Sequence, residues 1–180
     1  MEKTNHSNVL IVGGGCAGIA VASRINNLKS DCTISIVEPS DKSLYQAAWT
    51  LVGAGAYNVE DTIKPMSSVM PSYVKWIKEY AEEFQPENNS LKTSGGTYTY
   101  DYLIVCPGLK LNFDGVVGLK ENLGKNNVCT NYSAEMATYT WDCLKQLDGG
   151  NLLFTEPPMP IKCAGAPQKI AYLAADHLKK

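Results

Sequence analysis

A glycine-rich turn near the N-terminus is the segment of this sequence best suited to bind a phosphate group. Its residues are Gly13, Gly14, Gly15, Cys16, Ala17 and Gly18. Gly13 permits a tight turn from strand to helix, Gly15 lets the backbone approach a pyrophosphate, and Gly18 allows the helix to pack closely on the strand. Glu38, at the end of the next apolar run, can accept hydrogen bonds from a ribose hydroxyl. An acid at this position favours FAD or NAD over a 2′-phosphorylated cofactor.

A second candidate for chemistry is Cys163, in the run Lys162-Cys163-Ala164-Gly165-Ala166-Pro167. The cysteine precedes an expected helix start and has a lysine beside it. A helix N-terminus and a nearby cation both stabilise the thiolate, which is the nucleophilic form of cysteine. The small residues that follow leave room for a reactant to approach the sulfur. A buried cysteine in a connecting turn is the alternative interpretation, and the local sequence leaves both open.

Two further polar residues are weaker candidates. Cys106 ends an apolar strand and could reach the edge of a cofactor, but a cysteine in that position is usually a small core residue, and we interpret it as one. Gln46 is a lone amide between apolar neighbours, next to the point where the chain is expected to cross the cofactor. A hydrogen bond from Gln46 to the nucleotide and a purely structural role remain equally open.

The glycine turn is expected to lie inside a βαβ unit. Residues 9–12 and 33–37 are continuous apolar runs, which are typical of buried parallel strands. The helix between them carries one apolar stripe at helical spacing, made of Ala17, Val21, Ile25 and Leu28. Residues 45–55 predict a short helix, residues 74–100 an antiparallel meander of short strands, and residues 101–106 a strand that rejoins the parallel sheet.

The last third of the sequence predicts a helix capped by Ser133 that runs to Leu147, a strand over residues 151–155 and a helix from about Pro167. A strand, a turn and a helix in this order are typical of the opening of a second βαβ unit. We therefore expect the chain to be the N-terminal part of a longer protein.

Composition and charge exclude several classes of function. The 180 residues are 44% hydrophobic and 19% charged, which is ordinary for a globular protein. A net charge of −2 with scattered basic residues argues against nucleic-acid binding. No apolar run is long enough to cross a bilayer, and no targeting segment is recognisable. Six cysteines without CxxC spacing and two histidines without ligand partners predict neither a metal site nor a disulfide framework.

Three motifs taken together resemble the sulfide:quinone oxidoreductase family, specifically its eukaryotic mitochondrial type. They are Ile36-Val37-Glu38-Pro39-Ser40, the segment from Tyr45-Gln46 through Trp49-Thr50-Leu51-Val52-Gly53-Ala54-Gly55-Ala56, and Pro160-Ile161-Lys162-Cys163-Ala164-Gly165-Ala166-Pro167-Gln168-Lys169-Ile170. The third motif is the most specific, because related NAD-reducing disulfide reductases and type II NADH dehydrogenases lack that cysteine stretch. The resemblance covers essentially the whole chain.

The resemblance implies an α/β protein with the fold of the two-dinucleotide-domain, disulfide reductase-like flavoproteins. Residues 1–112 would form a Rossmann-like FAD-binding domain that includes the meander of residues 74–100. Residues 113–180 would form a connection and the truncated start of a second Rossmann-like domain. FAD would contact the glycine turn and Glu38, with further contacts from Gln46 and the backbone of Ala81.

The implied activity is oxidation of hydrogen sulfide through FAD, with electrons passed to ubiquinone. Cys163 would be one of two redox cysteines that flank the flavin, and the sulfane sulfur would go to glutathione or sulfite. The family is peripheral to the mitochondrial inner membrane and attaches through C-terminal helices. Those helices and the second redox cysteine would lie beyond residue 180, so the chain alone is expected to be inactive.

This sequence departs mildly from the family pattern in two places. Ala47 stands where proline is common, and Cys106-Pro107 replaces a small apolar pair. Two alternative functions stay open: a noncatalytic, truncated nucleotide-binding protein, and another FAD-dependent enzyme such as an NADH:quinone oxidoreductase. Cys163 argues against the second alternative.

Overall fold

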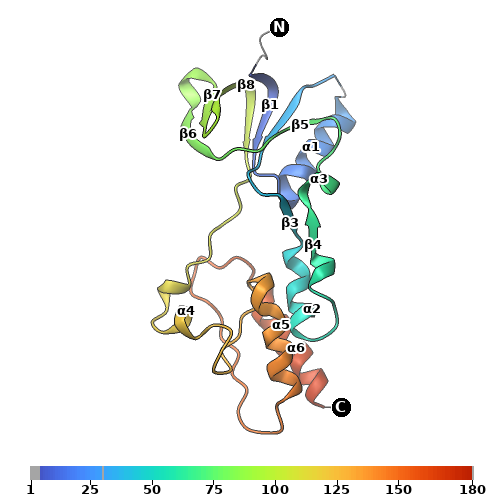
Figure 1. The fold of residues 1–180 in the computed structure, drawn as a ribbon, viewed down its shortest axis with the longest axis vertical. Helices are drawn as coiled ribbons and strands as arrows, with labels where there is room; N and C mark the ends of the chain where they lie inside the picture. The colour runs from blue at the N-terminus through green and yellow to red at the C-terminus, as the bar shows by residue number, and fades with distance from the viewer. Residues whose placement is uncertain (1–4, 30, 180) are drawn as a thin grey trace. The chain divides into compact units, whose positions relative to one another are not determined.

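A computed structural model describes residues 5–29 and 31–179. The chain folds into two compact units, each built from two segments (Figure 1). Unit 1 comprises residues 1–43 and 64–108, and unit 2 comprises residues 44–63 and 109–180. This grouping concerns contacts within the chain, so the domain boundary expected after residue 112 stays a prediction.

Unit 1 is organised around a mixed sheet of six strands in the order β5-β2-β1-β8-β7-β6. The strands are β1 (His6–Val12), β2 (Ile34–Val37), β5 (Val74–Ile77), β6 (Ala81–Gln85), β7 (Ser90–Thr93) and β8 (Gly96–Val105). The strands β5, β2, β1 and β8 are parallel, whereas β6 and β7 extend the sheet as an antiparallel meander. Val9 of the central strand β1 pairs with Ile34 on one side and Tyr102 on the other. The Rossmann-like α/β prediction is confirmed.

The region between residues 74 and 106 differs from the expectation in two respects. Its first strand, β5, belongs to the parallel part of the sheet, where it pairs with β2 instead of joining the meander. The last strand of the meander and the strand that rejoins the sheet are a single strand, β8. Its N-terminal half pairs with β7 and its C-terminal half with β1, so one uninterrupted strand serves both parts.

Helix α1 (Cys16–Leu28) covers one face of this sheet. Gly18 and Ala22 are the buried residues of the helix, and Ile19, Val21 and Ile25 pack against Val9, Ile11, Ile34 and Ile36 of the strands. The predicted stripe was therefore only half right. Ala17 is exposed and Leu28 is 70% exposed, because the buried face is centred on the small residues that allow close contact with the strands.

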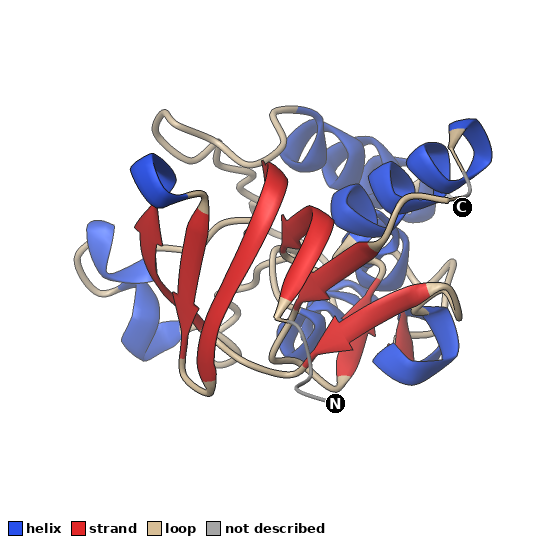
Figure 2. Cartoon of the chain, turned by 90° about the horizontal axis from the view of Figure 1, so that it is seen from above, coloured by secondary structure: helices blue, strands red, loops and turns tan. Residues whose placement is uncertain are grey.

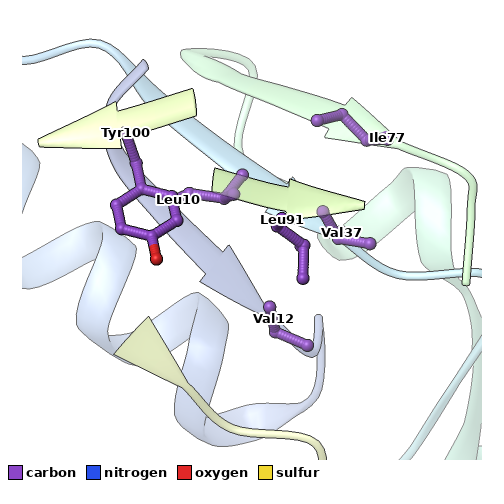
Figure 3. Packing of buried hydrophobic residues seen from close by; sticks show 6 residues of the cluster. All are labelled: Leu10, Val12, Val37, Ile77, Leu91 and Tyr100. Carbon is purple, nitrogen blue, oxygen red and sulfur yellow. The ribbon is translucent and has the colours of Figure 1, made fainter. Parts of the chain in front are cut away.

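The opposite face of the sheet is filled by a second cluster that reaches across several strands. Figure 3 shows its members: Leu10, Val12, Val37, Ile77, Leu91 and Tyr100. Ile77 lies on the edge strand β5 and Leu91 on β7, yet both contact the same cluster as Leu10 of β1. Sheets of this kind are twisted, and Figure 2 shows the red strands changing direction across the sheet.

The remaining short elements lie in unit 1 or where the chain runs from one unit into the other. The strands β3 (Lys42–Leu44) and β4 (Ile63–Pro65) form a separate two-stranded sheet. The short helix α3 (Met66–Val69) follows Pro65, and the 3₁₀ turn η3 (Pro86–Asn88) joins β6 to β7.

Among its described residues, unit 2 contains no β-strand apart from the last residue of β3 and the first residue of β4. Its helices are η1 (Gln46–Ala48), α2 (Trp49–Gly53), η2 (Glu60–Thr62), η4 (Phe113–Gly115), α4 (Leu119–Asn122), α5 (Ala134–Lys145) and α6 (Gly165–Leu178). Helix α2 packs against α5 and α6. Trp49 and Val52 of α2 form a core with Ala137 of α5, and the indole N–H of Trp49 donates to Thr62 Oγ1 at 3.2 Å.

The strand predicted over residues 151–155 does not form, and this prediction was wrong. The segment between α5 and α6 contains neither helix nor strand, and Leu153 is 84% exposed. An isolated strand leaves its backbone N–H and C=O groups unpaired, so an apolar segment stays irregular where no neighbouring strand is hydrogen-bonded to it. Both flanking helices form as expected, with three differences. The Ser133 side chain makes no capping hydrogen bond, α5 ends at Lys145 and not at Leu147, and Leu178 is exposed and not part of the buried face of α6.

Candidate functional site

Two glycines of the turn between β1 and α1 are required by the packing of the chain itself. Gly13 has a φ of +102°, and a Cβ atom there would lie 2.0 Å from the carbonyl oxygen of Cys106. A Cβ atom on Gly18 would lie 1.9 Å from the carbonyl oxygen of Gly13. These contacts bring β1, β8 and α1 together at the carboxyl ends of the parallel strands, where ligands bind in sheets of this type.

Gly15 has a different environment. It is the N-cap residue of α1, with a φ of −74° that any residue can adopt, and a Cβ atom there would meet no atom within 4 Å. Nothing within the described chain therefore requires glycine at this position. No side chain caps the helix and no acidic residue lies in its first turn. The first N–H groups of α1 thus face open space at the positive end of the helix dipole, which suits a pyrophosphate.

The Glu38 side chain is fixed beside this turn. One carboxylate oxygen accepts the N–H of Gly14 at 2.8 Å, and the other accepts the N–H of Ser40 at 2.8 Å. Its backbone is also held, because its N–H donates to Ile77 and its carbonyl accepts the indole N–H of Trp76, both to β5. Each carboxylate oxygen keeps a lone pair for a further donor, such as a ribose hydroxyl. The turn and the acid therefore fit a dinucleotide.

The other candidate residues in unit 1, Cys106 and Ala81, take part in the hydrogen bonding and packing of the fold. Cys106 directly follows β8, and its N–H donates to Val12 at 2.7 Å while its carbonyl lies against Gly13. Its backbone thus shapes the glycine turn. Ala81 begins β6, pairs with Thr93 and packs against the cluster of Figure 3. A nucleotide contact from Ala81 stays a prediction.

Cys163 and Gln46 come together in unit 2, where they line one cavity of about 230 Å³. Its walls are completed by Ala47, Thr50, Asn131, Tyr132, Lys162, Gly165, Ala166 and Lys169. Gln46, Tyr132 and Lys162 also line a neighbouring cavity of about 340 Å³. Thr50 is only 5% exposed and its hydroxyl has no hydrogen-bond partner, which leaves a buried polar group at the wall of the Cys163 cavity.

The Cys163 backbone is held at the start of α6 by two hydrogen bonds. Its carbonyl accepts the hydroxyl of Tyr132 at 3.0 Å and the N–H of Ala166 at 3.1 Å. The residue itself is exposed, so the thiol is open to a reactant. It precedes the N-cap residue Ala164, which places it near the positive end of a helix of 14 residues.

Two lysines line the same cavity as this cysteine. The Lys162 ammonium lies 5.8 Å from the ring centres of both Trp49 and Tyr132, so it is held by cation–π contacts. Burial lowers the pKa of Lys162, and the charge of Cys163 acts in the opposite direction. The Lys169 ammonium donates to the carbonyl of Ala47 at 3.4 Å. Burial raises the pKa of Tyr132, with smaller effects from Cys163 and Glu156.

Tyr132 and Lys169 were not anticipated as parts of the site. Lys169 enters the sequence-based predictions only as part of the third motif, and Tyr132 does not enter them. The distance in sequence between Tyr132 and Cys163 leaves no local pattern that links them. By contrast, Lys169 lies four residues after Gly165, the first residue of α6, so both share one face of that helix, and this spacing could have identified Lys169.

The fold and these residues define the class of protein. Residues 7–137 match the pyridine nucleotide-disulphide oxidoreductase family, and the chain belongs to that family. It is similar to the mitochondrial sulfide:quinone oxidoreductases of Dictyostelium discoideum, at 45% identity over 179 residues, and of Mus musculus, at 41% over 177 residues. Each alignment covers 98% of this chain but only 40% and 39% of the two relatives, so the chain spans about 40% of their length.

A solved structure supports the same relation. The sulfide:quinone oxidoreductase of the bacterium Aquifex aeolicus superposes with a TM-score of 0.63 at 30% identity, covering 78% of this chain and 32% of that protein. In residues 5–29 and 31–179 we find no helix with the length and apolar character that a membrane span requires. Within the same residues, His, Cys, Asp and Glu side chains do not gather in groups of three or more that could hold a metal ion.

Proposed function

We propose that this chain is the N-terminal part of an FAD-dependent sulfide:quinone oxidoreductase. The observation that carries the proposal is Cys163, an exposed thiol at the start of α6 in a cavity bordered by two lysines, in a chain 45% identical to such an enzyme. The substrates would be hydrogen sulfide and ubiquinone. The mitochondrial relatives support a mitochondrial location, and peripheral association with the inner membrane is part of the proposal.

FAD would be held by unit 1. The N–H groups at the start of α1 would donate to the oxygens of a pyrophosphate placed in the open space at Gly15, and Glu38 would accept a hydrogen bond from a ribose hydroxyl. Contacts from Gln46 and Ala81 are part of the proposal. Bound FAD would supply a two-electron acceptor, whose electrons would pass on to ubiquinone.

Cys163 would carry the sulfur chemistry together with a second cysteine. Hydrosulfide attacks the disulfide between the two cysteines, so that one keeps the new sulfur as a persulfide and the other leaves as a thiolate. Lys162 lines the same cavity as Cys163, and α6 begins two residues after the cysteine, so positive charge lies on the side from which the sulfur would react. A small acceptor, glutathione or sulfite, would then remove the sulfane sulfur.

The cofactor assignment is tested on the chain itself. We expect the 180-residue chain to quench flavin fluorescence on titration with FAD, and Glu38→Arg to weaken this binding by removing an acceptor and adding a cation. Equal FAD affinity of the two proteins would contradict the assignment. A chain that binds no FAD at all would instead favour a noncatalytic role.

The reaction is tested in a chimera in which this chain replaces the matching part of the Dictyostelium relative. We expect sulfide to bleach the flavin band anaerobically and to drive reduction of a ubiquinone analogue. Cys163→Ser should retain FAD but lose bleaching, whereas the matched control Cys106→Ser should keep both. Normal bleaching in Cys163→Ser would overturn the role of this cysteine. Bleaching by NADH in place of sulfide would favour an NADH:quinone oxidoreductase.

A further inference from the structure

A second group of thiols lies in unit 2, away from the lining of the Cys163 cavity, and is organised by Asn127. Asn127 has a φ of +61°, in the left-handed region. Its side-chain oxygen accepts the Cys143 thiol at 3.8 Å and its backbone carbonyl accepts the Cys129 thiol at 3.7 Å. Its N–H donates to the hydroxyl of Tyr139 at 3.1 Å. One turn residue therefore holds both sulfur atoms.

Helix α5 provides the other half of this group. Tyr139 and Cys143 are four residues apart on α5, so both face the turn that carries Asn127 and Cys129. The two thiols are thus held by two oxygen atoms of the same residue, and the charge of Cys143 acts on Cys129. Oxidation requires the Cβ atoms of the two cysteines to come within roughly 4 Å of each other. Both cysteines are half-buried, so small reagents can reach them.

We propose that Cys129 and Cys143 form a dithiol site that a low-molecular-weight disulfide oxidises to an intrachain disulfide. One cysteine thiolate attacks a sulfur of the small disulfide, forms a mixed disulfide and releases the first small thiol. The second cysteine then attacks the mixed disulfide, forms the bond between Cys129 and Cys143 and releases the second small thiol. The chain loses two protons and two electrons, and the small disulfide gains them.

The surroundings indicate the order of the two steps. Burial, and to a smaller extent the neighbouring Cys143, raises the pKa of Cys129 to about 12. Cys129 therefore stays protonated at neutral pH and is a poor attacking group. Cys143 makes the first attack. Once Cys143 is bonded in the mixed disulfide, its charge no longer raises the pKa of Cys129, and Cys129 resolves the mixed disulfide. The product would tie the turn at Asn127 to α5, which packs against α2.

The test uses mass spectrometry of the full chain. Trypsin cleaves after Lys125 and Lys145, so both cysteines lie in the single peptide 126–145. After treatment with oxidised glutathione, acid quenching and alkylation, we expect this peptide to be unalkylated and lighter by two hydrogen atoms. A reductant should then convert it to the doubly alkylated form.

Controls separate this geometry from chance pairing. The disulfide should form at least about tenfold faster in the folded chain than in denaturing urea, because only the fold holds the two thiols together. Cys129→Ser should trap a glutathione adduct on Cys143, and Cys32→Ser should leave the result unchanged. Equal rates in the folded chain and in urea, pairing of either cysteine with a different cysteine, or full alkylation of the peptide would each overturn the proposal.

Discussion

Gly13 and Gly15 lie two residues apart in the turn before α1, yet alanine should have opposite effects on folding at the two positions. At Gly13, a φ of +102° costs an alanine about 1–3 kcal/mol of backbone strain. The new Cβ atom would also overlap the Cys106 carbonyl, 2.0 Å away, and relieving such overpacking costs about 1–3 kcal/mol. We expect Gly13→Ala to destabilise unit 1 by about 3 kcal/mol or more.

At Gly15, alanine can adopt the observed backbone angles and meets no atom of the chain. Loss of glycine flexibility in the unfolded state should therefore stabilise the protein by about 0.4–1 kcal/mol. The same Cβ atom would occupy the space that we assign to the pyrophosphate. We expect FAD affinity to fall by about tenfold or more, which corresponds to about 1.4 kcal/mol.

Two measurements on the same variants separate these effects. Hydrogen exchange of the amides in β1 and β8 reports the stability of unit 1, and quenching of flavin fluorescence reports FAD binding. Exchange should accelerate strongly in Gly13→Ala and stay the same or slow in Gly15→Ala. Faster exchange in Gly15→Ala would refute the assignment of its glycine to a ligand, and so would unchanged FAD affinity in that variant.

Three further predictions concern single side chains. Glu38→Gln should lower the stability of unit 1 by about 1–3 kcal/mol in the same exchange experiment, because an amide NH₂ would face the N–H of either Gly14 or Ser40. Unchanged exchange would contradict the two hydrogen bonds of Glu38. Iodoacetamide should label Cys129 about a thousandfold more slowly at pH 8 than an ordinary thiol, since the pKa of Cys129 is raised from 9.0 to about 12. The labelling rate should rise about tenfold per pH unit until the pH reaches this pKa. Labelling at the ordinary rate would show that burial and Cys143 do not hold the proton. Tyr132→Phe should destabilise unit 2 by about 1 kcal/mol through loss of the hydrogen bond to Cys163, measured by urea titration, whereas Tyr172→Phe, at an exposed position, should change nothing.

The local pattern of the sequence was sufficient to predict the βαβ unit at the centre of unit 1. The apolar runs of β1 and β2, the glycine turn and α1 lie within 32 consecutive residues, and each glycine or strand was identified from its immediate neighbours. Glu38 could be placed beside the turn for the same reason, because it ends the second strand of that βαβ unit. The helices α5 and α6 also followed from local signals, although their exact buried residues did not.

Only the tertiary structure decided which strands pair and which residues far apart in the sequence come into contact. Nothing in residues 74–77 distinguishes a parallel edge strand from a meander strand, since that depends on hydrogen bonds to β2. Likewise, residues 151–155 have an apolar strand pattern, but a strand exists only where another strand pairs with it. The contacts of Tyr132 with Cys163, and of Cys129 and Cys143 with Asn127, join residues that share no local pattern. Periodicity reports which side of an element is apolar, whereas the partner on that side is chosen by the packing of the whole chain.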